Sequence, residues 1–257
     1  MKDKVVTINS LRINYKIAGK GPAVLILHGW GGSSDSWIEV EEFLVKKNYL
    51  VVAPDLPGFG KSSPPPEPWG IQDYSDFVFS FTEKLKMDSF FLLGHSFGGR
   101  ISIKFSSQHA DKLISLILCD AAGIRIEPDI KTKTILAAAR VGNVLFSHHL
   151  FAVIKERFRN IFYFLLRNRD YVKSNGVMRE TIKKALAENL FSELPKIKVK
   201  TLIIWGEADQ LVPLKCAYVF NKKITGSQLN VMPKIGHSPH LEAPEELSQI
   251  IISFLNS

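Results

Sequence analysis

The sequence predicts an α/β protein in which a mostly parallel, eight-stranded sheet is flanked by helices and interrupted by one helical insertion. Short apolar runs, typical of buried strands, alternate with segments of helical periodicity along most of the 257 residues. Short links join these segments, as in parallel sheets with helices on both faces. Residues 123–195 break the alternation because they contain no apolar run of the strand type.

The expected strands fall into two kinds. Residues 5–8 and 11–17 are joined by a turn at Asn9-Ser10, which predicts an antiparallel pair. The other six are mostly apolar, and those at residues 23–27 and 50–53 are continuous apolar runs, as expected for central strands covered on both faces. They lie at residues 23–27, 50–53, 90–93, 113–118, 201–205 and 228–232.

Helical periodicity fills the segments between the strands. In the core, helices are expected at residues 73–86, 100–108, 214–223 and 242–255. In the insertion, helical periodicity is present at residues 131–141, 144–157, 160–167 and 178–189. We therefore predict a core of residues 1–122 and 196–257 and an inserted helical cap of residues 123–195.

Positive charge is concentrated in this predicted cap. The formal net charge is +8, and residues 123–194 hold 13 Lys and Arg against 7 Asp and Glu. Neither a zinc finger nor an aromatic RNA-binding signature accompanies it, so we expect no nucleic-acid partner. Residues 144–167 mix aromatic side chains with arginines. Three interpretations remain open: a solvated lid surface, attraction of an anionic substrate or acidic carrier protein, and adsorption to an anionic membrane.

The sequence gives no sign of secretion or of a membrane span. Residues 1–10 alternate like a strand rather than a signal peptide, and no run of about 18 uncharged apolar residues occurs. Cys119 and Cys216 are too few for a disulfide framework. We therefore expect a cytoplasmic monomer or homodimer without stable membrane insertion.

The stretch Gly94-His95-Ser96-Phe97-Gly98 is the strongest candidate for chemistry. It follows an expected strand and begins an expected helix, so the tight turn exposes the hydroxyl of Ser96 beyond the sheet. A serine hydroxyl needs a base to act as a nucleophile at neutral pH. His237 follows the last strand and is the expected base, with His240 as a support residue or, less favoured, the base itself.

A carboxylate must orient the base, and amide donors must stabilise the developing oxyanion. Asp209 follows the seventh strand and is the expected acid, while Asp120, after the sixth strand, is the competing one. The backbone amides of Trp30 and Phe97 are the expected oxyanion donors. The residues expected near the substrate are His28, Gly29 and His95.

These motifs together resemble the α/β-hydrolase superfamily. The matching stretches are "LHGWGG", "DLPGFGKS", "GHSFGG", "WGEAD" and "GHSPHLEAPEEL", in the order of that fold. The resemblance implies Ser96, Asp209 and His237 as the catalytic triad. Haloalkane dehalogenases and epoxide hydrolases have an aspartate at the nucleophile position, so Ser96 favours ester chemistry.

The function that we predict is a cofactor-free, metal-free serine carboxylesterase acting on small to medium acyl esters through an acyl-enzyme. Two alternatives on the same triad are a carbon–carbon bond hydrolase and a perhydrolase. From a different class, the chain could be a ligand receptor that turns over slowly or not at all. The parts needed for catalysis are all present, which favours an enzyme.

Overall fold

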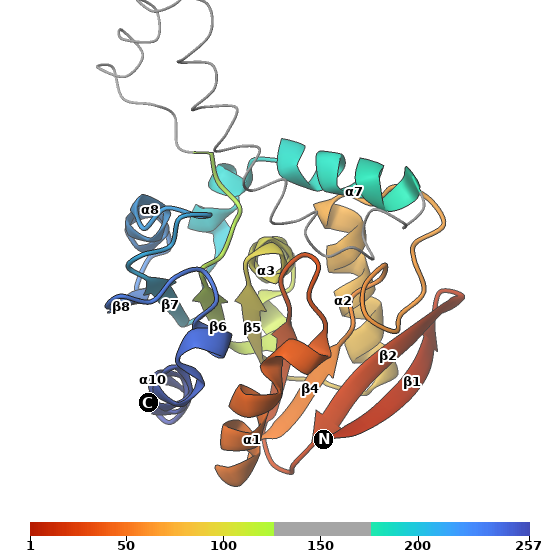
Figure 1. The fold of residues 1–257 in the computed structure, drawn as a ribbon, viewed down its shortest axis with the longest axis horizontal. Coiled ribbons are helices and arrows are strands. Elements are labelled where there is room, and N and C mark those ends of the chain that lie inside the picture. The colour runs from red at the N-terminus through yellow and green to blue at the C-terminus, as the bar shows by residue number, and fades with distance from the viewer. Residues whose placement is uncertain (126–175) are drawn as a thin grey trace, which may run out of the picture. The chain divides into compact units, whose positions relative to one another are not determined.

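The eight expected strands form a single sheet in the order β1-β2-β4-β3-β5-β6-β7-β8 (Figure 1). The computed structural model describes residues 1–125 and 176–257. The strands are β1 (Lys2–Ile8), β2 (Leu11–Ala18), β3 (Ala23–Leu27), β4 (Leu50–Pro54), β5 (Phe90–His95), β6 (Leu113–Cys119), β7 (Thr201–Gly206) and β8 (Gln228–Met232). β2 pairs antiparallel with β1 and β4, and the remaining pairs are parallel. The predicted fold class is confirmed.

Helices cover both faces of the sheet. On one face α1 (Ile38–Lys46) packs against α10 (Pro244–Leu255), and on the other α2 (Ile71–Lys84) packs against α3 (Phe97–Gln108) (Figure 1). The other described α-helices are α7 (Gly176–Ala187), α8 (Lys215–Lys223) and α9 (Pro239–Glu242). Short 3-10 turns are η1 (Ser34–Trp37), η2 (Ala110–Lys112), η3 (Leu190–Ser192) and η4 (Leu194–Lys196).

The core follows the two-residue period of the strands. In β3, Val24 and Ile26 pack into the cluster formed with α1 and α10, while Leu25 and Leu27 are buried on the opposite face. A strand buried on both faces has no polar side, which is why the central strands appear in the sequence as continuous apolar runs.

The last helix of the predicted insertion packs on the core. The helix expected at residues 178–189 is α7, and the nearby guanidinium of Arg100 donates to Ala185 O at 2.6 Å and also to Glu188 O. Trp69 N donates to Thr181 Oγ1 at 3.1 Å. Met1–Ile124 and Asn175–Ser257 form one compact unit. The helices expected at residues 131–141, 144–157 and 160–167 lie outside the described residues.

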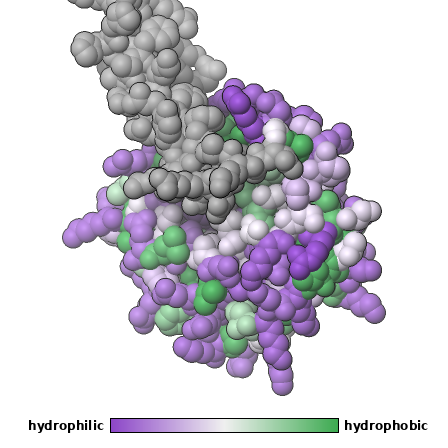
Figure 2. Space-filling view, turned by 45° about the vertical axis from the view of Figure 1, so that its right-hand side comes forward, coloured by the Kyte–Doolittle hydropathy of each residue, from purple (hydrophilic) through white to green (hydrophobic). Residues whose placement is uncertain are grey.

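Figure 2 shows one face of the molecule, where hydrophilic side chains predominate and apolar ones form small, separate groups. Large exposed apolar side chains occur on several elements, among them Val5, Ile114, Tyr218 and Leu241. Scattered exposure of this kind is ordinary for a folded protein. Within residues 1–125 and 176–257, no helix combines the length and apolar character needed to cross a bilayer.

Helix α1 is not predicted by the apolar pattern because a carboxylate lies on its buried face. Val40 and Leu44 are fully buried, and so is Glu41 between them. Neither carboxylate oxygen of Glu41 has a hydrogen-bond partner in the described part of the chain. Burial raises the pKa of Glu41 to about 8.

We expect Glu41 to destabilise the fold as pH rises. Its carboxyl holds its proton in the folded state up to about pH 8, whereas the unfolded chain loses it near pH 4.5. Stability therefore falls across this window, because the folded state binds more protons there. Glu41→Gln removes this penalty and should stabilise the protein by a few kcal/mol above about pH 8, with little effect below about pH 4.5.

Thermal unfolding across this pH range measures the effect. The control is Glu39→Gln, an exposed glutamate on the same helix, which should leave the pH dependence unchanged. Identical pH slopes for the wild type and Glu41→Gln would show that Glu41 is not a buried, proton-binding group.

Candidate active site

The carboxyl ends of the central strands gather the predicted residues at one edge of the sheet. β3, β5, β6, β7 and β8 run parallel and in adjacent register up to these ends. The segments that follow them carry His28, Ser96, Asp120, Asp209 and His237. This edge is where open α/β sheets bind their ligands.

Ser96 lies on a strained turn between β5 and α3. Its φ of 51° and ψ of −109° are unusual for a residue with a side chain. The glycines on either side allow the turn: a Cβ on Gly94 would lie 2.2 Å from Ser102 Oγ, and one on Gly98 would lie 2.2 Å from Leu27 O. Ser96 is partly exposed between buried neighbours, so its hydroxyl remains accessible at the end of the sheet.

A chain of hydrogen bonds connects the predicted triad. His237 Nε2 lies 2.9 Å from Ser96 Oγ, and His237 Nδ1 lies 2.7 Å from Asp209 Oδ2. The Asp209 side chain is fully buried, and its Oδ1 accepts from Leu211 N at 2.7 Å and Val212 N at 2.9 Å. With the carboxylate fixed at Nδ1, Nε2 of a neutral His237 is free to accept the serine proton.

The loop after β3 lies against the serine turn. A Cβ on Gly29 would come within 3.3 Å of Ser96 Cβ, and the rings of Trp30 and Phe97 are 4.9 Å apart. Phe97 begins α3, so its amide has no acceptor within the helix. The predicted oxyanion donors, Trp30 and Phe97, are thus on the two segments that flank Ser96; their role stays a prediction.

Aromatic side chains form a wall beside Ser96. Phe97, next in sequence to the serine, has its ring 5.0 Å from that of Tyr74 and 6.1 Å from that of Phe59. Trp30 packs edge-on against Phe59 at 4.8 Å. Phe97, Tyr74 and Phe59 are buried, and Trp30 is the one member of the four that is partly exposed.

Comparison with known proteins identifies the fold family. A family model described as alpha/beta hydrolase fold matches residues 22–146. This chain has the α/β-hydrolase fold. It is 26% identical over 261 residues to monoacylglycerol lipase ABHD6 of Mus musculus, covering 93% of this chain and 77% of that protein.

Two further proteins are similar to this chain over nearly its whole length. The 2-hydroxy-6-oxo-6-phenylhexa-2,4-dienoate hydrolase of Burkholderia cepacia is 27% identical, covering 98% of this chain and 96% of that protein. The structure of a thermophilic esterase from Thermogutta terrifontis superposes with a TM-score of 0.75 at 25% identity, covering 100% of this chain and 98% of that one. Hydrolysis is the reaction common to the three.

The backbone around His237 is held by two residues that flank it in space. His95 Nε2 donates to the carbonyl oxygen of His237 at 2.8 Å. The carboxylate of Glu242, on α9, accepts from Gly236 N at 2.7 Å and from Ser238 N at 3.0 Å. Glu242 is a positioning residue that was not predicted from the sequence. Its place six residues after Gly236 is the one sequence signal that could have indicated a carboxylate accepting from these amides.

The prediction that His28 and His95 contact the substrate needs correction. His28 is 1% exposed, and its Nε2 accepts from Leu56 N at 3.0 Å, so Nδ1 carries the proton and donates to Gly29 O. His95 is 5% exposed and faces the His237 backbone. Both rings are occupied by the protein's own backbone, and they support the site rather than line it.

His240 is also a support residue in this geometry. Its ring stacks on Trp37 at 4.4 Å and lies 4.6 Å from that of His95. Burial lowers the pKa of His240 to about 3 and that of His95 well below its usual range. Both are neutral at physiological pH, so neither adds a positive charge beside His237.

Asp120, Asp209 and His237 are close enough to share a metal ion, since one ligand atom of each lies within 4.8 Å of the others. Their atoms are already engaged, however. Asp120 Oδ1 accepts from Gly206 N at 2.9 Å, and both oxygens of Asp209 are hydrogen-bonded. The arrangement fits a hydrogen-bonded chain better than a metal centre.

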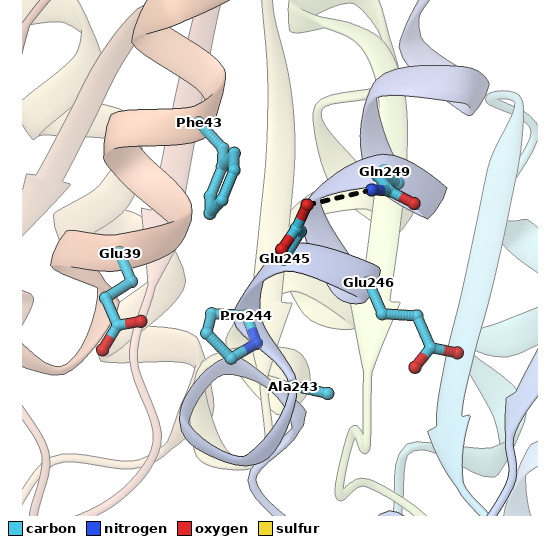
Figure 3. A pocket seen from close by; sticks show the side chains of 7 residues that line it. All are labelled: Glu39, Phe43, Ala243, Pro244, Glu245, Glu246 and Gln249. Carbon is cyan, nitrogen blue, oxygen red and sulfur yellow. Dashed lines mark hydrogen bonds between the residues drawn. The ribbon is translucent and has the colours of Figure 1, made fainter.

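A groove of about 510 Å³ lies elsewhere, between α1 and α10 (Figure 3). Its lining residues are Glu39, Phe43, Ala243, Pro244, Glu245, Glu246 and Gln249. Neither the triad nor the aromatic wall contributes to it, so we do not assign it to the substrate.

Proposed function

We propose that this protein is a serine carboxylesterase that works through an acyl-enzyme intermediate. The observation that carries the proposal is the unbroken chain of hydrogen bonds from Ser96 through His237 to Asp209, at 2.9 and 2.7 Å. Both distances are hydrogen-bond distances, as expected between a nucleophile and its base and between that base and the acid that orients it. The strained turn at Ser96 supports the same role.

The first half-reaction forms the acyl-enzyme. Ser96 Oγ attacks the ester carbonyl carbon while His237 Nε2 takes the hydroxyl proton, and Asp209 stabilises the resulting imidazolium. The carbonyl electrons move to oxygen, where the amides of Trp30 and Phe97 hold the oxyanion. As the tetrahedral intermediate collapses, the carbon–oxygen bond to the alcohol breaks, and His237 gives its proton to the departing alcohol.

The second half-reaction releases the acid. His237 takes a proton from water as the water oxygen attacks the acyl carbon, and the same amides hold the second oxyanion. Collapse breaks the bond to Ser96 Oγ, which regains its proton from His237. Every proton passes through this one imidazole, so the cycle needs no external acid or base.

The aromatic wall supports an apolar acyl group as the preferred substrate. Phe97 lies next to the nucleophile, and Trp30 and Phe59 pack against it, all within 6.1 Å between ring centroids. We therefore keep small to medium acyl esters as the proposed substrates. Attraction of an anionic substrate or acidic carrier protein by the cap stays a prediction, since residues 144–167 lie outside the described part.

Hydrolysis of a p-nitrophenyl ester series from acetyl to palmitoyl tests this function. We expect turnover that peaks at one acyl length. Each added methylene strengthens binding in an apolar pocket only until the pocket is filled. Folded protein that hydrolyses none of the series would contradict the proposal and favour carbon–carbon bond hydrolysis or a receptor.

Carbon–carbon bond hydrolysis is the second candidate. It is favoured by the similarity to the Burkholderia cepacia hydrolase of a phenylhexadienoate, which is 27% identical over 98% of this chain. That reaction can use the same three side chains. Assay of such a dienoate beside the best ester separates the two candidates: a kcat/KM that is higher for the ester supports the esterase, and the reverse order supports the second candidate.

A further inference from the structure

Asp120 is a fully buried carboxyl group at the end of β6. Its backbone is left-handed, with a φ of 43°, and its amide donates to Ile204 O at 3.0 Å. This conformation is costly for a residue with a side chain. It places the side chain beside β7, where Oδ1 accepts from Gly206 N at 2.9 Å.

The Asp120 carboxyl group faces that of Asp209. A carboxyl oxygen of each lies within 4.8 Å of the other and of a His237 ring nitrogen. A hydrogen bond between two carboxyl groups requires a proton on one of them, because ionised carboxylates only accept. Two ionised carboxylates would also repel strongly in this buried setting.

The hydrogen-bond partners indicate which acid keeps the proton. Asp209 accepts from Leu211 N, Val212 N and the His237 ring, all of which favour its ionised form. Asp120 accepts from a single amide, with the Cys119 thiol as a weak donor at 3.6 Å. Burial, reinforced by the charge of Asp209, raises the pKa of Asp120 to about 9.

We propose that Asp120 is a fourth member of the catalytic relay: a protonated, buried carboxyl group that donates a hydrogen bond to Asp209 and so fixes the carboxylate facing His237. This inference rests on the proposed function, in which Asp209 is the triad acid. Asp120 touches neither substrate nor reacting atoms, and it acts as a positioning residue. Asp120 gives the Asp209 carboxylate a fourth hydrogen-bond donor, and it occupies the space on the side of that carboxylate where water could otherwise bind.

The arrangement predicts an alkaline transition in activity. Above about pH 9, Asp120 loses its proton, the donor to Asp209 disappears, and a second negative charge arises beside it. The titratable groups that face Asp120 in residues 1–125 and 176–257 are Asp209, His237 and Cys119. We therefore expect kcat to change between about pH 8 and pH 10, with KM affected less.

The matched variants are Asp120→Asn and Asp120→Leu. Asparagine keeps a neutral donor to Asp209 and cannot titrate, so kcat should stay well above that of the leucine variant and should lose the alkaline transition. Leucine removes the donor and should lower kcat by about 10- to 100-fold. All variants carry Glu41→Gln, which removes the other carboxyl group with a pKa near 8.

Equal kcat for the two variants would overturn the proposal, as would an alkaline transition that persists in Asp120→Asn. A second readout is independent of turnover, and of whether the leucine variant folds. The infrared difference spectrum between about pH 7 and pH 10.5 should show loss of the carbonyl band of a protonated carboxylic acid, absent in Asp120→Asn. No such band in the wild type would overturn the proposal. If the wild type shows this band but Ser96→Ala stays active, the proposed function would be contradicted, whereas the protonated state of Asp120 would still be supported.

Discussion

Replacing Ser96 with alanine should lower kcat for the best p-nitrophenyl ester by about a million-fold, by analogy with serine-protease triads. The change removes the hydroxyl oxygen that lies 2.9 Å from His237 Nε2, and no acyl-enzyme can form. Substrate affinity should change little, because the aromatic wall and the amides remain. Steady-state kinetics, with active-site titration to exclude trace wild type, measure both quantities.

Ser107→Ala is the control for this substitution. Ser107 lies on the same helix, α3, and its hydroxyl donates to Lys104 O and Glu193 Oε2. We expect wild-type kcat from this variant. If Ser96→Ala kept more than a thousandth of the wild-type rate, a nucleophile other than Ser96 would be required.

Replacing Asp209 with asparagine should lower kcat by about ten thousand-fold, with KM changed far less. The amide can still accept from Leu211 N and Val212 N, so the loop geometry is retained. It cannot stabilise an imidazolium, and an amide N–H facing Nδ1 favours the wrong tautomer of His237. Kinetics over a range of pH, with crystal or NMR checks of the loop, measure the effect.

The companion variant for Asp209→Asn is Asp120→Asn, since Asp120 is the competing acid in the sequence. If the triad acid is Asp209, only its substitution produces the large loss. A large loss from Asp120→Asn with a mild one from Asp209→Asn would reverse the assignment.

The proximity of Ser96, Asp209 and His237 could be predicted from the sequence because each follows a strand. An apolar run fixes where a parallel strand ends, and the ends of neighbouring strands meet at one edge. Ser96, Asp209 and His237 each follow an expected strand, so their order and proximity could be inferred without knowing any distance. Six of the eight strands were predicted from their apolar runs, whereas β1 and β2 were predicted from the turn that joins them.

Features that depend on the direction of a side chain were not predictable in this way. His95 stands beside Ser96 in the sequence, yet its ring turns to the His237 backbone. Helix α1 could not be predicted from the apolar pattern because Glu41 interrupts its buried face. Glu242 holds two amides across a turn, and only the folded loop shows that these amides point at one carboxylate.

Covalent labelling tests the central claim most directly. An alkyl fluorophosphonate reacts with a serine that a neighbouring histidine activates, and intact-mass and peptide mass spectrometry then locate the adduct. We expect one equivalent of label, on the peptide that contains Ser96, and none in Ser96→Ala. Label on another residue, or unlabelled wild-type protein that still hydrolyses esters, would contradict the assignment of Ser96 as the nucleophile.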